Sequence, residues 1–110
     1  MPFKLIVLYP TPCDAGRFED DYHGEHMPLM RSLIAPNSRL ATFRVRGPGV
    51  APYYRLAEVH FASLEELNAF ARSEVGQGAR RSSERVSSGG KPIVLVCEQD
   101  ALCEASGTPC

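Results

Sequence analysis

The segment spanning residues 18–29 contains the side chains best suited to chemistry. Phe18, Tyr22 and His26 follow one another at intervals of four residues, so a helix would carry two aromatic rings and an imidazole on one face. We expect Pro28 to kink or end the turn that carries His26, because proline lacks the N–H that an interior helical position uses. An imidazole at such a break can face a cavity.

His26 admits a functional and a structural interpretation. As a catalytic group, a neutral imidazole with an ordinary pKa of about 6.5 could accept or return a proton on a carbonyl or phenolic substrate. As a structural group, it could cap the carbonyl groups left unpaired at the break before Pro28. A metal site has less support: His23 and His26 would share a helix face, but Glu25 points elsewhere and the sequence fixes no third ligand. We therefore predict no metal.

Further aromatic side chains and another histidine complete the candidate binding site. Tyr22 and Tyr54 are candidate pocket walls, because a tyrosine hydroxyl can donate a hydrogen bond to a substrate oxygen, although buried tyrosines are more often core residues. Glu58 and His60 alternate onto one strand face, where they could pair across a dimer seam or face the pocket. The predicted substrate-binding residues are Tyr9, Phe18, Tyr22, Tyr54 and His60.

Composition limits the class of protein. The 110 residues, of which 44% are hydrophobic, predict one domain with a small core, so we expect a partner subunit. A formal net charge of -1 gives no reason to expect nucleic acid or an anionic membrane as a partner. The sequence has no apolar run of the roughly 20 residues that a membrane helix needs and no secretory leader pattern, so we expect a cytoplasmic protein.

The cysteines predict no disulfide framework. No secretory pattern precedes them, and their number is low for the length of the chain. We expect reduced thiols, although two cysteines in the polar C-terminal segment could pair after purification in air. The four cysteines are Cys13, Cys97, Cys103 and Cys110.

Apolar patterns predict four strands and two helices. The strands are expected at residues 3–9, 39–46, 53–61 and 91–98. The third of these should turn Ala57, Val59 and Phe61 to the core, with Tyr54, Leu56, Glu58 and His60 on its other face.

The helices follow from their capping signals. One helix is expected from an Asp14 N-cap to about Ile34, with a turn at Pro36–Asn37. A second should begin after Ser63, in a capping box with Glu66, and be interrupted by glycines at 76 and 78. The polar segment 79–90 is expected to hold a short helix and then a mobile loop. The acidic run 19–21 is expected to be a solvated helix start.

The order strand, helix, strand, strand, helix, strand predicts a ferredoxin-like α+β fold. Two split βαβ units give a four-stranded antiparallel sheet with both helices on one face. Residues 1–100 would form this domain and residues 101–110 a polar tail. Because the first and last strands are apolar on both sides, we expect the bare face of the sheet to pack against the same face of a second copy.

Residues along nearly the whole chain to Glu98 carry a family resemblance. They are Tyr9-Pro10, Asp14, Phe18, Asp21-Tyr22, His26-x-Pro28-Leu29, Tyr53-Tyr54-Arg55-Leu56-Ala57 and Phe61-x-Ser63. With these residues the sequence resembles the EthD family of small dimeric α+β barrel proteins, named from a gene cluster for degrading ethyl tert-butyl ether. The resemblance implies the dimeric barrel fold. Most EthD relatives have no assigned reaction, so it implies fold more than chemistry.

One segment departs from the family pattern. Such proteins commonly have an acidic residue followed by an aromatic between the second helix and the last strand, whereas this chain reads Ser82-Ser83-Glu84-Arg85-Val86. If that acidic residue assists the histidine in relatives, the departure puts the same assistance to His26 in question. Related dimeric barrels include monooxygenases, muconolactone isomerases, haem-degrading enzymes, and cyclases or dehydratases of aromatic polyketides.

We therefore predict an EthD-like protein that binds a small organic substrate. His26 would assist proton transfer on an oxygenated apolar or aromatic catabolic compound, in an isomerase, lyase or cofactor-free monooxygenase. The alternatives are a non-catalytic accessory or carrier subunit of a degradation pathway and a purely structural dimer module. No flavin, nicotinamide or phosphate-binding glycine motif appears, so we predict no cofactor, and an oxidation would be cofactor-free or use an added haem.

Overall fold

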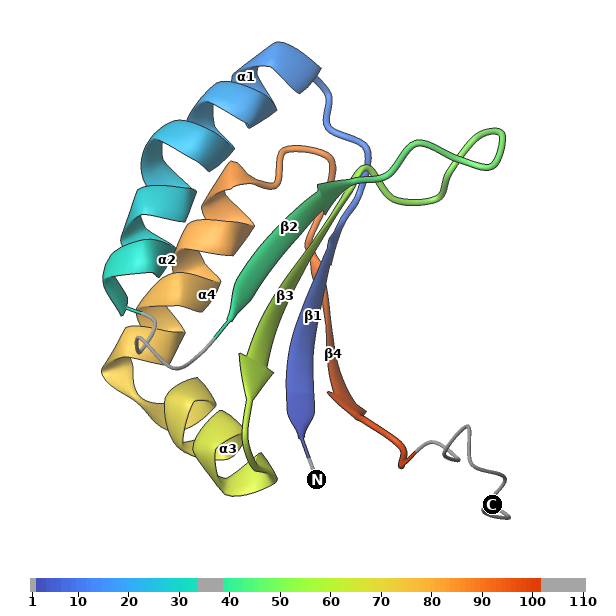
Figure 1. The fold of residues 1–110 in the computed structure, drawn as a ribbon. Coiled ribbons are helices and arrows are strands. Elements are labelled where there is room, and N and C mark those ends of the chain that lie inside the picture. Colours follow the sequence, from blue (N-terminus) through green and yellow to red (C-terminus); the bar gives the residue numbers. More distant parts are fainter. Residues whose placement is uncertain (1, 34–38, 102–110) are drawn as a thin grey trace.

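The protein is a four-stranded antiparallel sheet with its helices on one face (Figure 1). The computed structural model describes residues 2–33 and 39–101. The strand order β2-β3-β1-β4 confirms the predicted ferredoxin-like α+β fold. In chain order the elements are β1 (Phe3–Tyr9), α1 (Ala15–Asp21), the π-helical turn η1 (Tyr22–His26), α2 (Met27–Leu33), β2 (Leu40–Arg44), β3 (Arg55–Phe61), α3 (Leu64–Arg72), α4 (Glu74–Val86) and β4 (Ile93–Glu98).

Some sequence predictions fall outside the described residues. These are the end of the first helix at Ile34, the turn at Pro36–Asn37, and the tail from residue 102 onward with Cys103 and Cys110. Within residues 2–33 and 39–101, no helix has the length and hydropathy that a membrane span requires.

The first helical path is continuous through the expected break. Asp14 caps it as predicted, accepting a hydrogen bond of 3.1 Å from the Arg17 N–H. At η1 the path widens into a π-helical turn, in which the Met27 N–H bonds to the carbonyl of Tyr22, five residues back. The helix therefore does not end near His26, which was one of the two alternatives expected; its type changes there. The wider turn ends two residues before Pro28, whose missing N–H interrupts the α-helical pattern there in any case.

The polar segment after α3 forms the helix α4, which begins earlier than predicted, at Glu74, and runs through Val86. Residues 87–92 then connect it to β4 without regular structure, where a loop was expected. Ser63 caps α3 as predicted, but the Glu66 carboxylate accepts from the Ala62 N–H and not from Ser63 itself. Ser73 then caps α4 by accepting from the Gly76 N–H. A Cβ at Gly76 would clash with the carbonyl of Phe70, so this glycine lets the two helices approach closely and does not interrupt one.

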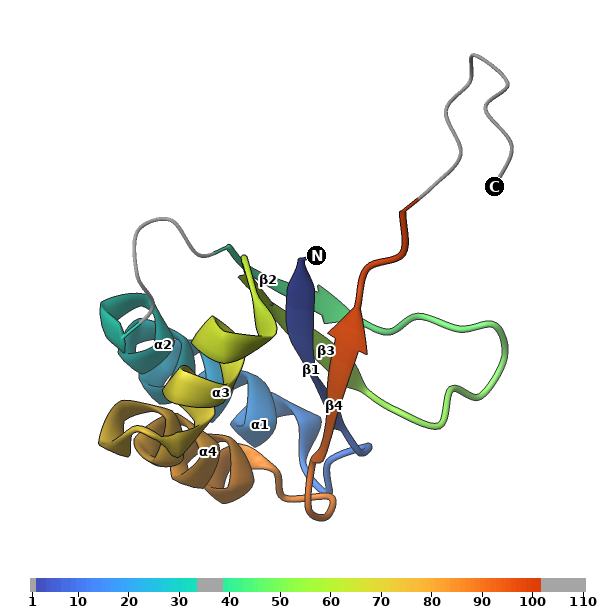
Figure 2. The ribbon, with the colours of Figure 1, turned by 90° about the horizontal axis from the view of Figure 1, so that it is seen from below.

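The register of the strands divides the sheet into a covered and a bare face. Val7 of β1 lies opposite Ala57 of β3 and Val94 of β4, and these residues point toward the helices. Their neighbours point the other way, as in the cross-strand pair Leu8 and Leu56. Figure 2 shows the helices gathered on one side of the sheet. The residues on the bare face are Lys4, Ile6, Leu8, Ala41, Phe43, Leu56, Glu58, His60, Ile93, Leu95 and Cys97.

The covered face holds two groups of buried residues. One contains Tyr9, Phe18, Tyr22, Met27 and Tyr54, and the other Met30, Val59, Phe61, Leu67 and Ala79. The placement of Tyr54 corrects the prediction that it shares a face with Leu56 and His60. It precedes β3, and its ring meets that of Phe18 edge-on at 5.3 Å on the covered side.

Candidate functional site

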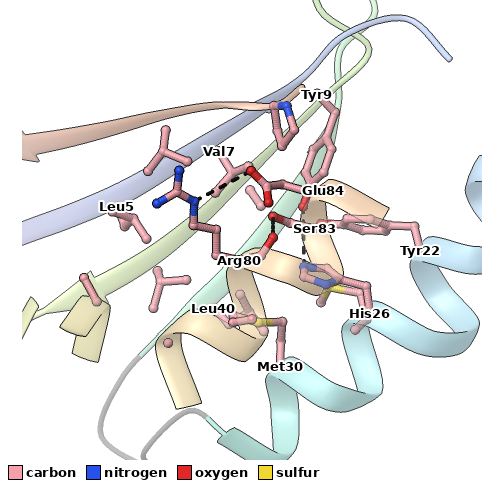
Figure 3. Close-up of a pocket in the computed structure, with 18 of the residues that line it drawn as sticks. Leu5, Val7, Tyr9, Tyr22, His26, Met30, Leu40, Arg80, Ser83 and Glu84 are labelled. Atoms are coloured by element: carbon pink, nitrogen blue, oxygen red, sulfur yellow. Dashed lines mark hydrogen bonds and ion pairs between the residues drawn. The ribbon is translucent and has the colours of Figure 1, made fainter. Parts of the chain in front are cut away.

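A cavity of about 400 Å³ lies on the covered face, between α4, the path from α1 to α2 and the sheet (Figure 3). The buried side chains of Tyr9, Tyr22 and His26 form its inner end. Its rim carries charged residues of α4 and of the segment before β4. The volume falls within the range of small-molecule sites. Its middle is apolar and includes Leu5, Val7, Met30, Leu40 and Val59.

The imidazole of His26 is held between two hydroxyl groups. His26 is only 4% exposed. It is the last residue of the η1 turn, and this turn packs against α4. Its Nδ1 lies 2.9 Å from the Ser82 Oγ, and its Nε2 lies 3.4 Å from the Tyr9 hydroxyl. In one tautomer Nδ1–H donates to Ser82 and Nε2 accepts; in the other tautomer the roles are exchanged. The imidazole therefore connects a hydroxyl on α4 with one on β1.

Burial favours the uncharged forms of His26 and Tyr9. It lowers the pKa of His26 to about 4, with a smaller contribution from the positive charge of Arg85. Burial also raises the pKa of the Tyr9 phenol, and Tyr22 adds to the effect, while Ser83 and Arg55 oppose it. The inner end thus combines a neutral imidazole with a protonated phenol. Such a pair can exchange hydrogen bonds and a proton with a bound oxygen atom.

Tyr22 contributes its ring to the cavity, and its hydroxyl is already bonded. The hydroxyl lies 2.8 Å from the Thr42 Oγ1 on β2. The ring stacks on Phe18 at 5.4 Å between centroids, and the Arg55 guanidinium lies 4.8 Å from its centroid on the side of β3. Burial is the main reason that the pKa of Tyr22 is raised. Tyr22 is therefore a rigid wall of the site.

Phe18 and Tyr54 do not line the cavity; their rings pack edge-on behind it, and Tyr54 joins a partly buried ion-pair network. The Arg55 guanidinium donates through Nη2 to both oxygens of the Glu19 carboxylate, each at 2.9 Å. The Tyr54 hydroxyl donates to the same carboxylate at 2.7 Å. Burial alone would raise the pKa of Glu19, but these hydrogen bonds from Tyr54 and Arg55 lower it. The sequence suggested that Glu19 belongs to a solvated acidic run, but its carboxylate is instead bound by Tyr54 and Arg55.

The two other histidines lie away from the inner end of the cavity. His60 is on the bare face, 3.3 Å from Glu58, which also binds Lys4 at 2.9 Å. His23 is half-exposed and pairs with Glu19 at 3.0 Å. Among the described residues, no group of three or more His, Cys, Asp or Glu side chains is placed to hold a metal ion.

Sequence reasoning missed the contribution of α4. Three small residues and a valine recur along it at helical spacing, namely Gly76, Ala79, Ser83 and Val86, and this pattern marks the face that packs on the site. Ser82, on the same buried side, stands in the segment that departs from the EthD pattern and supplies the hydroxyl beside His26. The polar composition of the segment concealed this signal. Arg55 was missed because a strand arginine is ordinarily exposed.

Comparisons with known proteins agree on fold and size. No family model matches the chain. An uncharacterized 11.0 kDa protein in the thcB-thcC intergenic region of Rhodococcus erythropolis is 26% identical over 101 residues, which cover 91% of this chain and 98% of that protein. The crystal structure of an ethyl tert-butyl ether degradation (EthD) family protein from Bacillus halodurans matches with a TM-score of 0.79 and 25% identity. It covers 91% of this chain and 100% of that one.

Two less similar structures share the fold. A dimeric ferredoxin-like protein of unknown function from Jannaschia has a TM-score of 0.67 at 17% identity, covering 90% of this chain and 100% of that chain. Hydroxynitrile lyase from Passiflora edulis has a TM-score of 0.68 at 14% identity, covering 94% and 97%. The resemblance to the EthD family, stated above from sequence motifs, is confirmed by the Bacillus structure.

Proposed function

Because the chain resembles the EthD family in both sequence and fold, we propose that it is a cytoplasmic catabolic enzyme acting on a small oxygenated apolar or aromatic molecule. The cavity on the covered face would hold the substrate, and His26 would transfer a proton to and from it. Tyr9 would donate a hydrogen bond to a substrate oxygen, and the ring of Tyr22 would orient the bound molecule.

One observation carries this proposal. The buried imidazole of His26 contacts Ser82 at 2.9 Å and Tyr9 at 3.4 Å, at the inner end of a cavity of about 400 Å³. A histidine that only closed a helix break would need no such cavity beside it. The longer Tyr9 contact leaves room for a substrate oxygen to take over one of the two hydrogen bonds.

The geometry suits a reaction that begins with removal of a proton. Nε2 would take the proton and later return it, so the protein itself undergoes no net change in oxidation state. Isomerisation, elimination and oxygenation of the cofactor-free type all fit this requirement. A lyase with the same fold, the Passiflora hydroxynitrile lyase, supports the elimination class by analogy. A pKa of about 4 makes His26 a weak base, so the substrate proton should be activated, as in a phenol.

A carrier or accessory subunit is the second candidate. The same low basicity favours it, since a neutral imidazole can hold a ligand oxygen without turnover. Loss of turnover with retained binding in His26→Ala separates catalysis from carriage. A different result would be a compound that the purified wild type binds and that cell extracts convert, but that the purified protein does not convert. That result would show that the protein is a carrier and not an enzyme.

We also propose that the protein forms a homodimer through the bare face of the sheet. Large apolar side chains are exposed there, such as Phe43 at 51%. The dimeric Jannaschia protein offers a precedent for the fold. Leu56→Asp should yield a folded monomer in light scattering, whereas Val50→Asp, at a fully exposed loop position, should leave the dimer intact. A monomeric wild type at micromolar concentration would contradict this assignment.

The test of the function is a thermal-shift screen against small lactones, phenols, quinones and haem. A compound that binds the native state raises its melting temperature. We expect at least one compound to stabilise the wild type and His23→Asn, but not a folded His26→Ala. His23→Asn is the matched control, because His23 lies one turn earlier on the same helical path and is half-exposed. If no compound shifts the wild type and His26→Ala only melts earlier, His26 is structural.

A further inference from the structure

The charges around the cavity point to a narrower class of ligand. We propose that the cavity takes an amphiphilic monocarboxylate, whose carboxylate binds Arg80 and Lys91 at the rim and whose oxygenated end lies against His26 and Tyr9. This inference rests on the proposed function, because it concerns the same cavity. It goes further by stating which charge the ligand carries and at which end.

The inner end of the cavity is unsuited to a charged group. Tyr9, Tyr22 and His26 are buried there and uncharged at neutral pH. Arg55, the cation nearest to Tyr22, does not line the cavity and is bound to the Glu19 carboxylate through two contacts of 2.9 Å. An anion at the inner end would lose its hydration without gaining a counter-charge. The inner end therefore selects a neutral oxygenated group.

The rim, in contrast, carries an excess of positive charge. Among the described residues that line the cavity, the ionised groups are Arg80, Lys91 and Glu84. Arg80 and Lys91 both approach the same Glu84 carboxylate at 3.7 Å, which is a loose pairing. One carboxylate cannot neutralise two cations, so the rim has a net charge of one positive unit. Figure 3 shows the Arg80 side chain extending from α4, with a dashed line joining it to Glu84.

Apolar side chains separate the two ends. Leu5, Val7 and Val59 from the sheet and Met30 from α2 line the middle of the cavity. Arg80 and Lys91 are 65% and 72% exposed, so they keep most of their hydration and can bind an anion without first being desolvated. A ligand with an apolar body would place its carboxylate at the rim and its other end beside His26. This arrangement would also fix which end of the substrate reacts.

Isothermal titration calorimetry with three probes of equal chain length tests the inference. The probes are octanoate, 1-octanol and octylamine, which differ in the charge of one end. We expect octanoate to bind more tightly than 1-octanol at low salt, and octylamine to bind most weakly. Raising the salt concentration should weaken octanoate and leave 1-octanol unchanged, because salt screens the exposed rim charges.

Variants locate the carboxylate. Arg80→Gln and Lys91→Gln should each weaken octanoate by about threefold and leave 1-octanol unaffected, as expected for one exposed charge pair. Arg81→Gln is the matched control, because Arg81 is the next residue on α4 and does not line the cavity. Glu84→Gln should strengthen octanoate binding, since it removes the competing carboxylate from the rim.

The outcomes separate this inference from the proposed function. If 1-octanol binds as tightly as octanoate, or if Arg81→Gln weakens octanoate as much as Arg80→Gln does, the carboxylate assignment is overturned and the small-molecule site remains. The contact beside His26 is tested with 8-hydroxyoctanoate, which carries a hydroxyl at the end away from its carboxylate. If His26→Ala leaves its affinity intact while Arg80→Gln reduces it, the rim assignment holds and binding beside His26 fails. If none of the three probes binds, the carboxylate class is rejected, and the wider screen alone decides the proposed function.

Discussion

The two faces of the sheet place a histidine in opposite environments. On the covered face, His26 is 4% exposed and its partners are the neutral hydroxyls of Ser82 and Tyr9. On the bare face, His60 lies beside the Glu58 carboxylate, whose pKa is lowered mainly by the hydrogen bond from Lys4. Charges are thus paired on the bare face and absent from the inner end of the cavity.

This difference separates a chemical role from an assembly role. A neutral imidazole beside a cavity can exchange a proton with a ligand, whereas a paired histidine on an apolar face is better suited to fixing how two sheets pack. The same residue type at two positions therefore predicts two functions. The predictions below test whether the faces differ in this way.

The largest effect is expected from truncating an aromatic ring on each face. Tyr22→Ala should lower the free energy of unfolding by about 3–5 kcal/mol at any protein concentration, because it empties a fully buried position. Phe43→Ala should lower the free energy of unfolding by less, and by an amount that grows with protein concentration, because only a partner subunit would bury the Phe43 ring. Urea denaturation at two protein concentrations measures both. Equal, concentration-independent losses would remove the distinction between the faces.

The next effect is the response of stability to acid. The pKa of His26 falls from 6.5 to about 4 on folding, so between these values the unfolded chain binds a proton that the native protein does not. Stability from this group is complete above pH 6.5 and is lost as the pH falls toward 4, by on the order of 3 kcal/mol. The difference in unfolding free energy between wild type and His26→Asn should therefore shrink in this range. His60→Asn serves as the control and should not remove the dependence.

A smaller effect is expected from the hydroxyl beside the imidazole. Ser82→Ala should destabilise the protein by about 1 kcal/mol, because it leaves one buried imidazole nitrogen without its partner. Ser88→Ala, at an exposed serine, is the matched control and should change little. Chemical denaturation gives both values. A neutral Ser82→Ala would mean that Ser82 does not orient His26.

The smallest effect concerns the charged pair on the bare face. At protein concentrations where the chain is monomeric, Glu58→Gln should cost roughly 0.2–1 kcal/mol, with a loss that declines at high salt, because Lys4 and Glu58 form a partly exposed ion pair in the single chain. Folding depresses the pKa of Glu58, so this contribution is present above the ordinary carboxylate range and is lost as the pH falls through the native pKa. Unfolding curves at two salt concentrations provide the measurement. A larger, salt-independent loss would indicate a buried charge.

The sequence predicted the fold because its local signals agree with its global pattern. Asp14 and Ser63 mark the starts of helices through side-chain caps, and alternation along β3 separates Ala57 from Glu58. Such signals act within a few residues. The spacing of Phe18, Tyr22 and His26 also predicted one buried face correctly.

The remaining errors concern contacts between distant segments. Ser82 meets His26 across 56 positions of the chain, and Arg55 meets Glu19 across 36, so neither pair leaves a local pattern. The glycine at 76 looked like a helix breaker, yet it is required by the approach of α3 to α4. Which face of β3 holds His60 became clear only when the helices were placed. Site geometry of this kind depends on tertiary packing.

The most direct measurement is a nitrogen NMR titration of the imidazole side chains, with and without 1-octanol as a cavity probe. The chain has three histidines, so assignment by single variants is simple. The account predicts that His26 stays neutral at pH 5.5 and that 1-octanol shifts its resonances while those of His60 remain unchanged. A His26 imidazole that is charged at pH 5.5, or one that bound 1-octanol leaves unshifted, would contradict a ligand site at His26.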